Sequence, residues 1–237
     1  MERLTHELRR AYWRYVRHSS QYRRDAWAMQ ALAPLSSPYL PWTYFAMRPG
    51  ALVTILNDIA INDRRRIVEC GGGTSTLYIA RLLRERDGHL HTVEENADWA
   101  ESLARQLGAE GLADRVSVIH APLGDVRLDD GIHPWYAPEA LGPLVEARGI
   151  DLLTVDGPVA EQDPQIRYPA LGFFHDSLQP GATVVVDDVD RLGEQRIVRR
   201  WEAEHGLRFD RRPLDGIAVA TVPAPQRDGD WGARVRT

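Results

Sequence analysis

A glycine-rich turn between an expected strand and an expected helix constrains this chain more than any other feature. The run RRRIVECGGGTSTLYIARLL spans residues 64–83 and reads as a short buried strand, three glycines and a helix start. The glycines are Gly71, Gly72 and Gly73, and the helix opens with Thr74, Ser75 and Thr76. Because glycine has no Cβ, a ligand can closely approach the backbone N–H groups of such a turn. The stretch therefore predicts a ligand site at the carboxyl end of a strand.

The residues around the turn indicate which ligand it takes. A dinucleotide fingerprint has a third glycine, which lets the helix pack on the strand, where this chain has Thr76. Glu69, which precedes the glycines, is unfavourable beside a pyrophosphate and suits a cationic or ammonium-bearing ligand. A nicotinamide-dependent oxidoreductase is thus an alternative against which both residues count.

Composition narrows the class of protein. A chain of 237 residues fits one large α/β domain with additional N-terminal structure. Its net charge of −5 provides no basic field for nucleic acid, which is not expected as a partner. Cys70 is the single cysteine, so neither an internal disulfide nor a cysteine-based metal cluster is expected. We find no pattern of a signal peptide or membrane helix, and we expect a cytoplasmic protein without a membrane partner.

The two ends of the chain differ from its centre. Residues 1–33 place apolar side chains at helical spacing between arginines, which predicts an amphipathic arm packed on the domain or on a second copy in a homodimer. Prolines then end the helix and begin a loop with several aromatic residues. These side chains are expected to form a lid, to line the substrate site or to belong to the core. These are Tyr39, Trp42, Tyr44 and Phe45. The expected divisions are an arm and lid at 1–45, a ligand-binding domain at 46–222 and a flexible tail at 223–237.

Between the ends, expected strands and helices alternate. The strands are expected at 66–70, 89–95, 115–120, 150–155, 181–188, 207–212 and 217–222. Helices are expected from residue 46 to the Asn62-Asp63 pair and at 74–86, 97–109, 166–178 and 192–204. Residues 124–149 are expected to be a long irregular segment. The alternation, closed by a hairpin, predicts an α/β fold with a doubly wound, mostly parallel seven-stranded sheet and one antiparallel strand.

Acidic residues end several of these strands. Glu94 and Glu95 end the second, roughly twenty residues after the glycines, where a carboxylate can accept hydrogen bonds from ribose hydroxyls. Glu94 is the preferred member of the pair. The third strand is followed by Pro122 and Leu123, where a parallel fold would border an adenine ring. The pattern favours a ligand that contains a nucleoside.

Three aspartates form a second group. Asp156 ends the fourth strand, and Asp187 and Asp188 end the fifth. Carboxylate oxygens at strand tips suit a hard divalent ion such as Mg²⁺. Two other interpretations remain: an aspartate that caps the next helix, or ion pairs with Arg167 or Arg191.

Several motifs together resemble class I S-adenosylmethionine (SAM) dependent methyltransferases, in particular a bacterial subgroup similar to catechol-type O-methyltransferases. They span roughly residues 40–222 and are AMRPGAL, VECGGGTST, TVEEN, HAPLG, LLTVDGP, RYPAL and PGATVVVDDVDR. The resemblance implies that Glu69, Gly71 and Gly73 line the methionine part of SAM. It also implies that Glu94 holds the ribose and that Pro122 and Leu123 border the adenine. The remaining expected cofactor-binding residues are Thr74, Ser75, Thr76, Glu95 and Asp156.

The same resemblance implies that Asp156, Asp187 and Asp188 hold Mg²⁺ and that the methyl group passes in line to an oxygen of a small hydroxylated molecule. Catechol-type enzymes have a lysine base three residues after the first aspartate, where this chain has Val159. His133 and His175 are therefore candidate bases, or the metal alone acidifies the substrate hydroxyl. Two alternatives remain open: a metal-independent N- or O-methyltransferase of the same fold, and a non-catalytic module that retains the fold.

Overall fold

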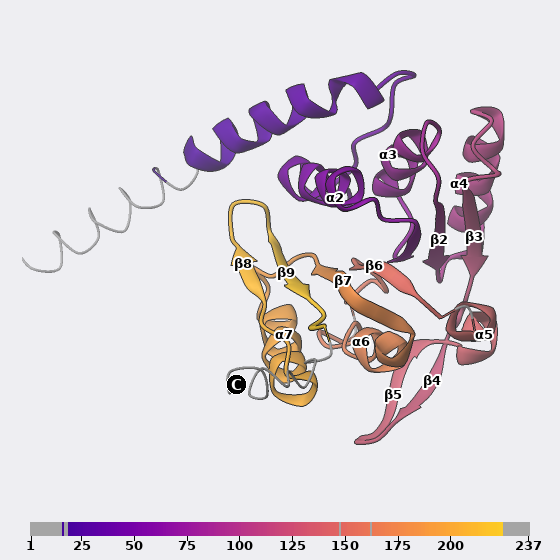
Figure 1. Ribbon diagram of the computed structural model, residues 1–237, viewed down its shortest axis with the longest axis vertical. Coiled ribbons are helices and arrows are strands. Elements are labelled where there is room, and N and C mark those ends of the chain that lie inside the picture. Colours follow the sequence, from indigo (N-terminus) through magenta and orange to yellow (C-terminus); the bar gives the residue numbers. More distant parts are fainter. Residues whose placement is uncertain (1–15, 17–18, 147, 162, 225–237) are drawn as a thin grey trace, which may run out of the picture.

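The computed structural model describes residue 16 and residues 19–146, 148–161 and 163–224. Most of the arm at residues 1–18 and the tail from residue 225 lie outside the described residues. Within them the chain forms a seven-stranded sheet with helices on both faces and a separate two-stranded sheet (Figure 1). The predicted α/β fold with a mostly parallel seven-stranded sheet is confirmed.

The large sheet has the strand order β3-β2-β1-β6-β7-β9-β8. Its strands are β1 (Arg66–Cys70), β2 (His89–Glu94), β3 (Val116–His120), β6 (Ile150–Val155), β7 (Leu178–Val186), β8 (Asp210–Arg212) and β9 (Ile217–Thr221). Neighbouring strands from β3 to β7 pair in parallel, whereas β9 is antiparallel to both β7 and β8. The parallel strands read as apolar runs because helices cover both of their faces. All six residues of β6 are buried.

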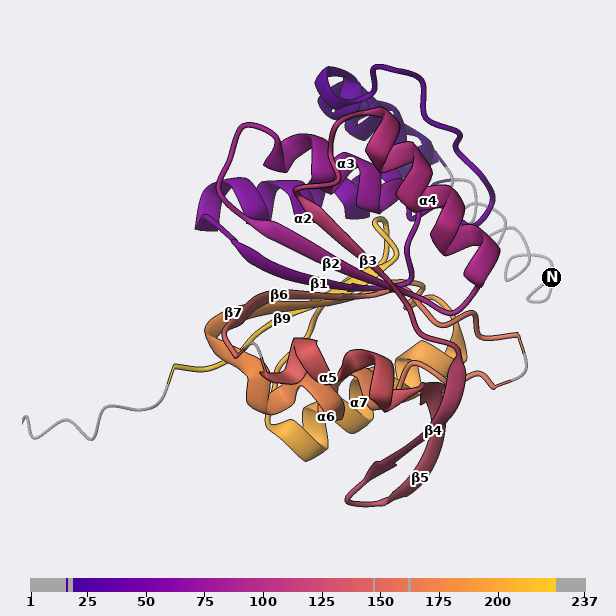
Figure 2. The ribbon, with the colours of Figure 1, turned by 90° about the vertical axis from the view of Figure 1, so that its right-hand side faces the viewer.

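The helices form two layers around this sheet (Figure 2). One layer contains α2 (Pro49–Asn62), α3 (Thr74–Leu83) and α4 (Ala97–Ala109). The other contains α5 (Pro138–Glu146), α6 (Pro169–Phe174) and α7 (Leu192–His205). Two short 3₁₀ helices complete the described elements. The first, η1 (Ala33–Leu35), follows the arm, and the second, η2 (His175–Ser177), follows α6. Each layer buries its own apolar cluster against the sheet.

The N-terminal arm is helical at residues 19–32 and packs on the α2 layer. Ala28 and Leu32 belong to the buried cluster of that layer. Arg24 makes two hydrogen bonds, of 2.6 and 2.8 Å, to the carboxylate of Asp215 in the β8–β9 turn. The arm is therefore joined to the far end of the chain through a bidentate ion pair.

The prediction of a long irregular segment at 124–149 was wrong. Residues there form an antiparallel hairpin of β4 (Leu123–Leu128) and β5 (Gly131–Tyr136), followed by α5. Burial explains the order, because Val126, Trp135 and Tyr136 enter the core. Pro134 counts against a strand in the sequence, but a two-stranded sheet consists of edges only, where a missing N–H is tolerated.

Smaller differences concern element ends. The helix expected at 166–178 is shortened to α6 and η2, and the strand expected from residue 181 already begins at Leu178. The helix expected to reach residue 86 ends at Leu83, and the strand expected from residue 207 begins at Asp210. The strand expected to end at Asp188 ends at Val186, so Asp187 and Asp188 follow β7 directly. The predicted site still lies at the carboxyl ends of the central strands.

Candidate active site

Two turns meet at the centre of the sheet, where β1 and β6 lie side by side. The carbonyl of Cys70 accepts hydrogen bonds from the N–H groups of Asp156 at 2.9 Å and Gly157 at 2.7 Å. Gly71 has a φ of +93°, and a Cβ built on it would lie 2.7 Å from the nitrogen of Gly157. Only glycine fits this position, because a side chain would be both strained and in collision. The turn thus needs glycine to bring β1 and β6 together.

Glu69 stabilises the turn from inside. Its carboxylate accepts hydrogen bonds from Ser75 Oγ at 2.6 Å and from Thr76 Oγ1 at 2.5 Å. Thr76 Oγ1 in turn accepts one from the N–H of Gly73 at 2.9 Å. Burial raises the pKa of Glu69 to about 7, against the lowering effect of the hydroxyls. Only 1% of Glu69 is exposed, and its carboxylate joins β1 to α3 through these hydrogen bonds. The predicted contact of Glu69 with a cofactor stays a prediction.

The open side of the turn is formed by backbone. Gly71, Gly72, Gly73 and Thr74 are partly exposed, whereas Ser75 and Thr76 are buried. A Cβ at Gly73 would meet nothing within 4 Å. The hydroxyl of Thr74 donates to the carbonyl of Pro41 at 3.1 Å, which fixes the aromatic loop beside the turn.

Glu94 lies beside the same turn, as predicted from its place at the end of β2. Its carboxylate accepts hydrogen bonds from the N–H groups of Gly72 at 3.1 Å and Asn96 at 2.9 Å. Burial raises its pKa to about 7. Trp99, which sequence reasoning missed, donates its indole N–H to the carbonyl of Gly72 at 2.7 Å. Both sides of the Gly72 peptide are therefore held in place.

Pro122 lies in the short connection between β3 and β4, and Leu123 is the first residue of β4. Both are exposed, and the carbonyl of Pro122 accepts a hydrogen bond from the N–H of Ala137 at 2.8 Å. Glu95 lies one residue beyond Glu94, but its carboxylate accepts a hydrogen bond from the N–H of Val159 at 3.1 Å. The structure thus separates the two glutamates that the sequence presents as a pair.

The three aspartates converge as predicted. One carboxylate oxygen from each of Asp156, Asp187 and Asp188 lies within 4.8 Å of the others. Burial raises the pKa of Asp156 to about 6, with Arg167 opposing the shift, and it raises the pKa of Asp187 well above its ordinary value. Asp188 has a φ of +60°, a left-handed conformation that aspartate tolerates better than most residues. A set of three hard oxygen donors fits Mg²⁺.

Two arginines share this cluster. The guanidinium of Arg167 lies 3.3 Å from Asp156 and 3.1 Å from Asp188, and that of Arg191 lies 2.9 Å from Asp188. Both also approach Glu194, at 3.7 and 4.0 Å. The ion-pair interpretation therefore holds for Asp188 and extends to Asp156. Four carboxylates face two guanidinium groups, so when all are ionised an excess of two negative charges is left, which a divalent cation would balance.

The two candidate histidines do not join the aspartates. His133 pairs with Asp130 at 2.9 Å, and Asp130 also binds Arg200 at 2.6 Å, on the middle of α7. His175 stacks on His205, with ring centroids 4.8 Å apart, at the last residue of α7. Because α7 begins four residues after Asp188 and has 14 residues, its far end lies roughly 20 Å away along the helix. His175 is therefore far from any substrate held by the aspartates. His133 also packs on Tyr168, with ring centroids 5.0 Å apart, and its predicted role as a base stays a prediction.

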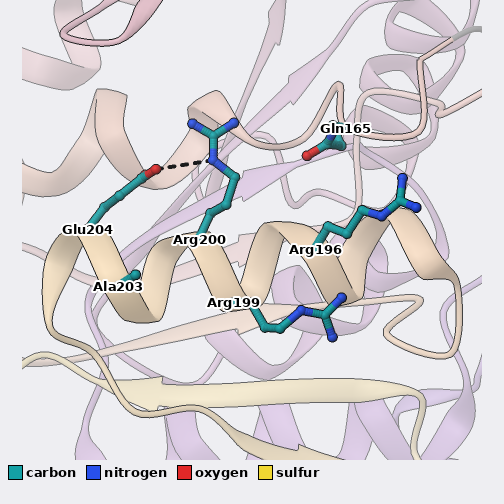
Figure 3. A pocket seen from close by; sticks show the side chains of 6 residues that line it. All are labelled: Gln165, Arg196, Arg199, Arg200, Ala203 and Glu204. Atoms are coloured by element: carbon teal, nitrogen blue, oxygen red, sulfur yellow. Dashed lines mark hydrogen bonds and ion pairs between the residues drawn. The ribbon is translucent and has the colours of Figure 1, made fainter.

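A shallow groove of about 410 Å³ runs along α7 (Figure 3). It is lined by Gln165, Arg196, Arg199, Arg200, Ala203 and Glu204. Arg200 donates to Glu204 at 3.1 Å within it. None of the predicted site residues lines this groove, so the chemistry implied by the sequence is concentrated at the strand ends.

The fold and the site define a class I SAM-dependent methyltransferase. A family model described as "Methyltransferase domain" matches residues 68–189, more than half of the chain. The chain belongs to this family. At the level of sequence, no curated protein matches it significantly. Among the residues that the structure describes, no helix is both long and apolar enough to cross a bilayer.

Solved structures share the fold at low sequence identity. The O-methyltransferase TomG from Streptomyces achromogenes, in complex with SAM, is 23% identical, with 85% of this chain and 90% of that chain covered and a TM-score of 0.53. An O-methyltransferase from Bacillus cereus in complex with SAH (S-adenosylhomocysteine) is 20% identical, with coverages of 84% and 90% and a TM-score of 0.58. The SAH-bound methyltransferase PaMTH1 of Podospora anserina is 14% identical, with coverages of 83% and 88% and a TM-score of 0.59.

Proposed function

We propose that this methyltransferase transfers the methyl group of SAM to a hydroxyl oxygen of a small molecule, with Mg²⁺ held by Asp156, Asp187 and Asp188. The observation that carries the proposal is the position of these carboxylates. They follow β6 and β7, next to the turn after β1. Similar folds in TomG and the Bacillus cereus enzyme, both O-methyltransferases, support the choice of oxygen.

The chain's own groups account for binding and orientation. The partly exposed glycine turn receives the methionine part of SAM, and Glu94 accepts hydrogen bonds from the ribose. Sulfonium is a good leaving group, so the main task of the protein is to align the methyl group with the acceptor oxygen. A bound Mg²⁺ would favour ionisation of a hydroxyl coordinated to it.

The acceptor site is proposed beside the aromatic loop. Tyr44 and Phe45 are 93% and 73% exposed, and their rings meet edge to face with centroids 5.7 Å apart. The loop is held to the cofactor turn by the Thr74–Pro41 hydrogen bond. Exposed aromatic rings on a loop joined to the cofactor turn suit a planar, hydroxylated acceptor.

One observation favours a second candidate, a metal-independent methyltransferase of the same fold. Arg167 already provides a buried positive charge between Asp156 and Asp188. In that case Arg167 and Arg191 neutralise Asp156 and Asp188, and no metal is needed. Activity with and without a chelator separates the two candidates.

We also propose a division of the chain into an arm and lid at 1–45, a catalytic domain at 46–222 and a tail at 223–237. The proposed location of the protein is cytoplasmic. A homodimer through the arm is supported by apolar side chains on its described part. Tyr22, Trp27 and Met29 are exposed there.

Calorimetric titration with SAH, in the presence and absence of Mg²⁺, tests the proposal. We expect micromolar binding in both conditions, followed by methylation of hydroxylated small molecules by labelled SAM only when Mg²⁺ is present. If SAH did not bind in either condition, the proposed function would be wrong, and a non-catalytic module would become the better interpretation.

A further inference from the structure

Glu95 connects two loops that the sheet keeps apart. In the strand order, β1 lies between β2 and β6. Glu95 directly follows β2, and Val159 lies four residues beyond the end of β6. The carboxylate of Glu95 nevertheless accepts a hydrogen bond from the N–H of Val159 at 3.1 Å. This contact therefore spans the carboxyl end of β1, where the glycine turn lies.

A second link between the β1 and β6 turns lies closer to the sheet. The backbones of Gly71 and Gly157 are in direct contact, since a Cβ on Gly157 would lie 2.6 Å from the Cα of Gly71. The Glu95–Val159 contact involves residues further along the loops than either glycine. The two links therefore join the loops at different distances along the chain from the strand ends, and the glycine turn between β1 and α3 is partly exposed.

We propose that the Glu95–Val159 hydrogen bond is a clasp that holds the bound cofactor against the strand ends, and that Glu95 is a positioning residue. This inference rests on the proposed use of SAM. A ligand seated on the glycine turn and extending to Glu94 would lie next to the two loops that this contact joins. The clasp slows its departure.

The chemistry of the contact suits this role. A charged carboxylate bonded to a backbone N–H is stronger than a neutral pair, yet a partly exposed one can open without leaving a buried group unpaired. Glu95 is only partly buried, and Val159 is 50% exposed. The donor is a backbone group, so the contact does not depend on the side chain at 159. The valine that replaces the lysine of catechol-type enzymes therefore does not prevent the clasp.

The test is the rate at which SAH dissociates from the full chain, measured by stopped flow. Glu95→Ala removes the acceptor, and losing a hydrogen bond to a charged group should raise this rate about tenfold or more. Glu95→Gln keeps an acceptor oxygen, so its rate should lie closer to wild type than to Glu95→Ala. Glu101→Ala, which removes an exposed carboxylate on α4, is the control and should behave as wild type.

The partner side of the contact gives an independent check. Val159→Pro removes the N–H, whereas Val159→Ala keeps it. Val159→Pro should accelerate SAH dissociation as Glu95→Ala does, and the double variant should be no faster than either single one, because both remove the same contact. The concentration of Mg²⁺ that gives half-maximal activity should not change in Glu95→Ala, whereas a general loosening of the site would move it.

The outcomes separate this inference from the proposed function. If wild-type protein binds no SAH, the proposed function fails and the clasp with it. If the wild type binds SAH but Glu95→Ala releases it at the wild-type rate, only the clasp is overturned. Additive effects of Glu95→Ala and Val159→Pro would also overturn it.

Discussion

The guanidinium of Arg167 lies 3.3 Å from the carboxylate of Asp156, so the chain places a cation of its own against a predicted metal ligand. The same guanidinium reaches Asp188. No ion pair within 4 Å reaches Asp187 from any residue that the structure describes. Asp187 is therefore a carboxylate that either a proton or an added cation must neutralise, and burial raises its pKa well above the ordinary value.

Replacement of Asp187 tests the metal. Because even outer-shell changes at metal sites cost 10- to 100-fold, we expect Asp187→Asn to lower kcat/KM in Mg²⁺ by about 100-fold or more while SAH affinity stays within about twofold. Asp190→Asn is the control, since this exposed aspartate pairs with Arg48 outside the cluster. Full activity of Asp187→Asn in the presence of EDTA would rule out the metal role and favour the metal-independent enzyme.

Gly73→Ala tests whether the cofactor approaches the turn closely. Residue 73 has an extended backbone with a φ of −174°, and an added Cβ meets no protein atom within 4 Å. The melting temperature should therefore stay unchanged. If SAH lies on this backbone, the methyl group should weaken its binding about tenfold, equivalent to about 1.4 kcal/mol. Gly108→Ala, in equally open space on α4, is the control in calorimetry. Unchanged SAH affinity in Gly73→Ala would remove the turn from the binding site.

The pH dependence of SAH binding tests Glu94. Burial raises its pKa from 4.5 to about 7, so the folded protein holds this proton at a pH where the unfolded chain has lost it. Ribose hydroxyls donate to the ionised form, and SAH affinity should therefore rise as the pH increases through about 7 and then level off. In Glu94→Gln this rise should be much smaller, and the affinity should be lower at pH 8. A rise of wild-type size in Glu94→Gln would assign the titration to another group.

The pH dependence of stability tests Glu69. Burial raises its pKa to about 7, so the unfolded chain loses the proton first. The free energy of unfolding therefore decreases progressively as the pH rises from about 4.5 to 7, by about 1.4 kcal/mol for each pKa unit of the shift. Compared with wild type, Glu69→Gln should lose less thermal stability as the pH rises from 5 to 8. If the melting temperatures of the two proteins changed equally with pH across this range, the raised pKa of the buried Glu69 carboxyl would be contradicted.

Light scattering tests the arm. If the exposed apolar side chains of the N-terminal helix pair two copies, the double variant Tyr22→Ser and Trp27→Ser should halve the mass measured for the wild type. The control is Tyr39→Ser, which removes an equally exposed ring outside the helix. A monomeric wild type would dismiss the dimer.

The sequence alone determined the central sheet and the residues at its carboxyl end. Strand β1, its glycine turn, and the acids at 94, 156, 187 and 188 follow from local patterns, because strand period, glycine conformation and helix starts depend on neighbours in the chain. Their convergence also follows, since parallel strands end at one edge. The hairpin β4–β5 was missed because the burial of Trp135 and Tyr136, which orders it, is a contact with distant core residues.

Tertiary structure alone decided what each polar group contacts. His133 and His175 are equal candidates for a base in the sequence, but in the structure His133 pairs with Asp130, whereas His175 stacks on His205 at the far end of α7. Glu94 and Glu95 are adjacent, yet one binds the glycine turn and the other crosses to Val159. The sequence pattern indicates which face of a strand or helix a residue occupies. A hydrogen bond between residues 64 positions apart depends instead on how the whole sheet positions two loops.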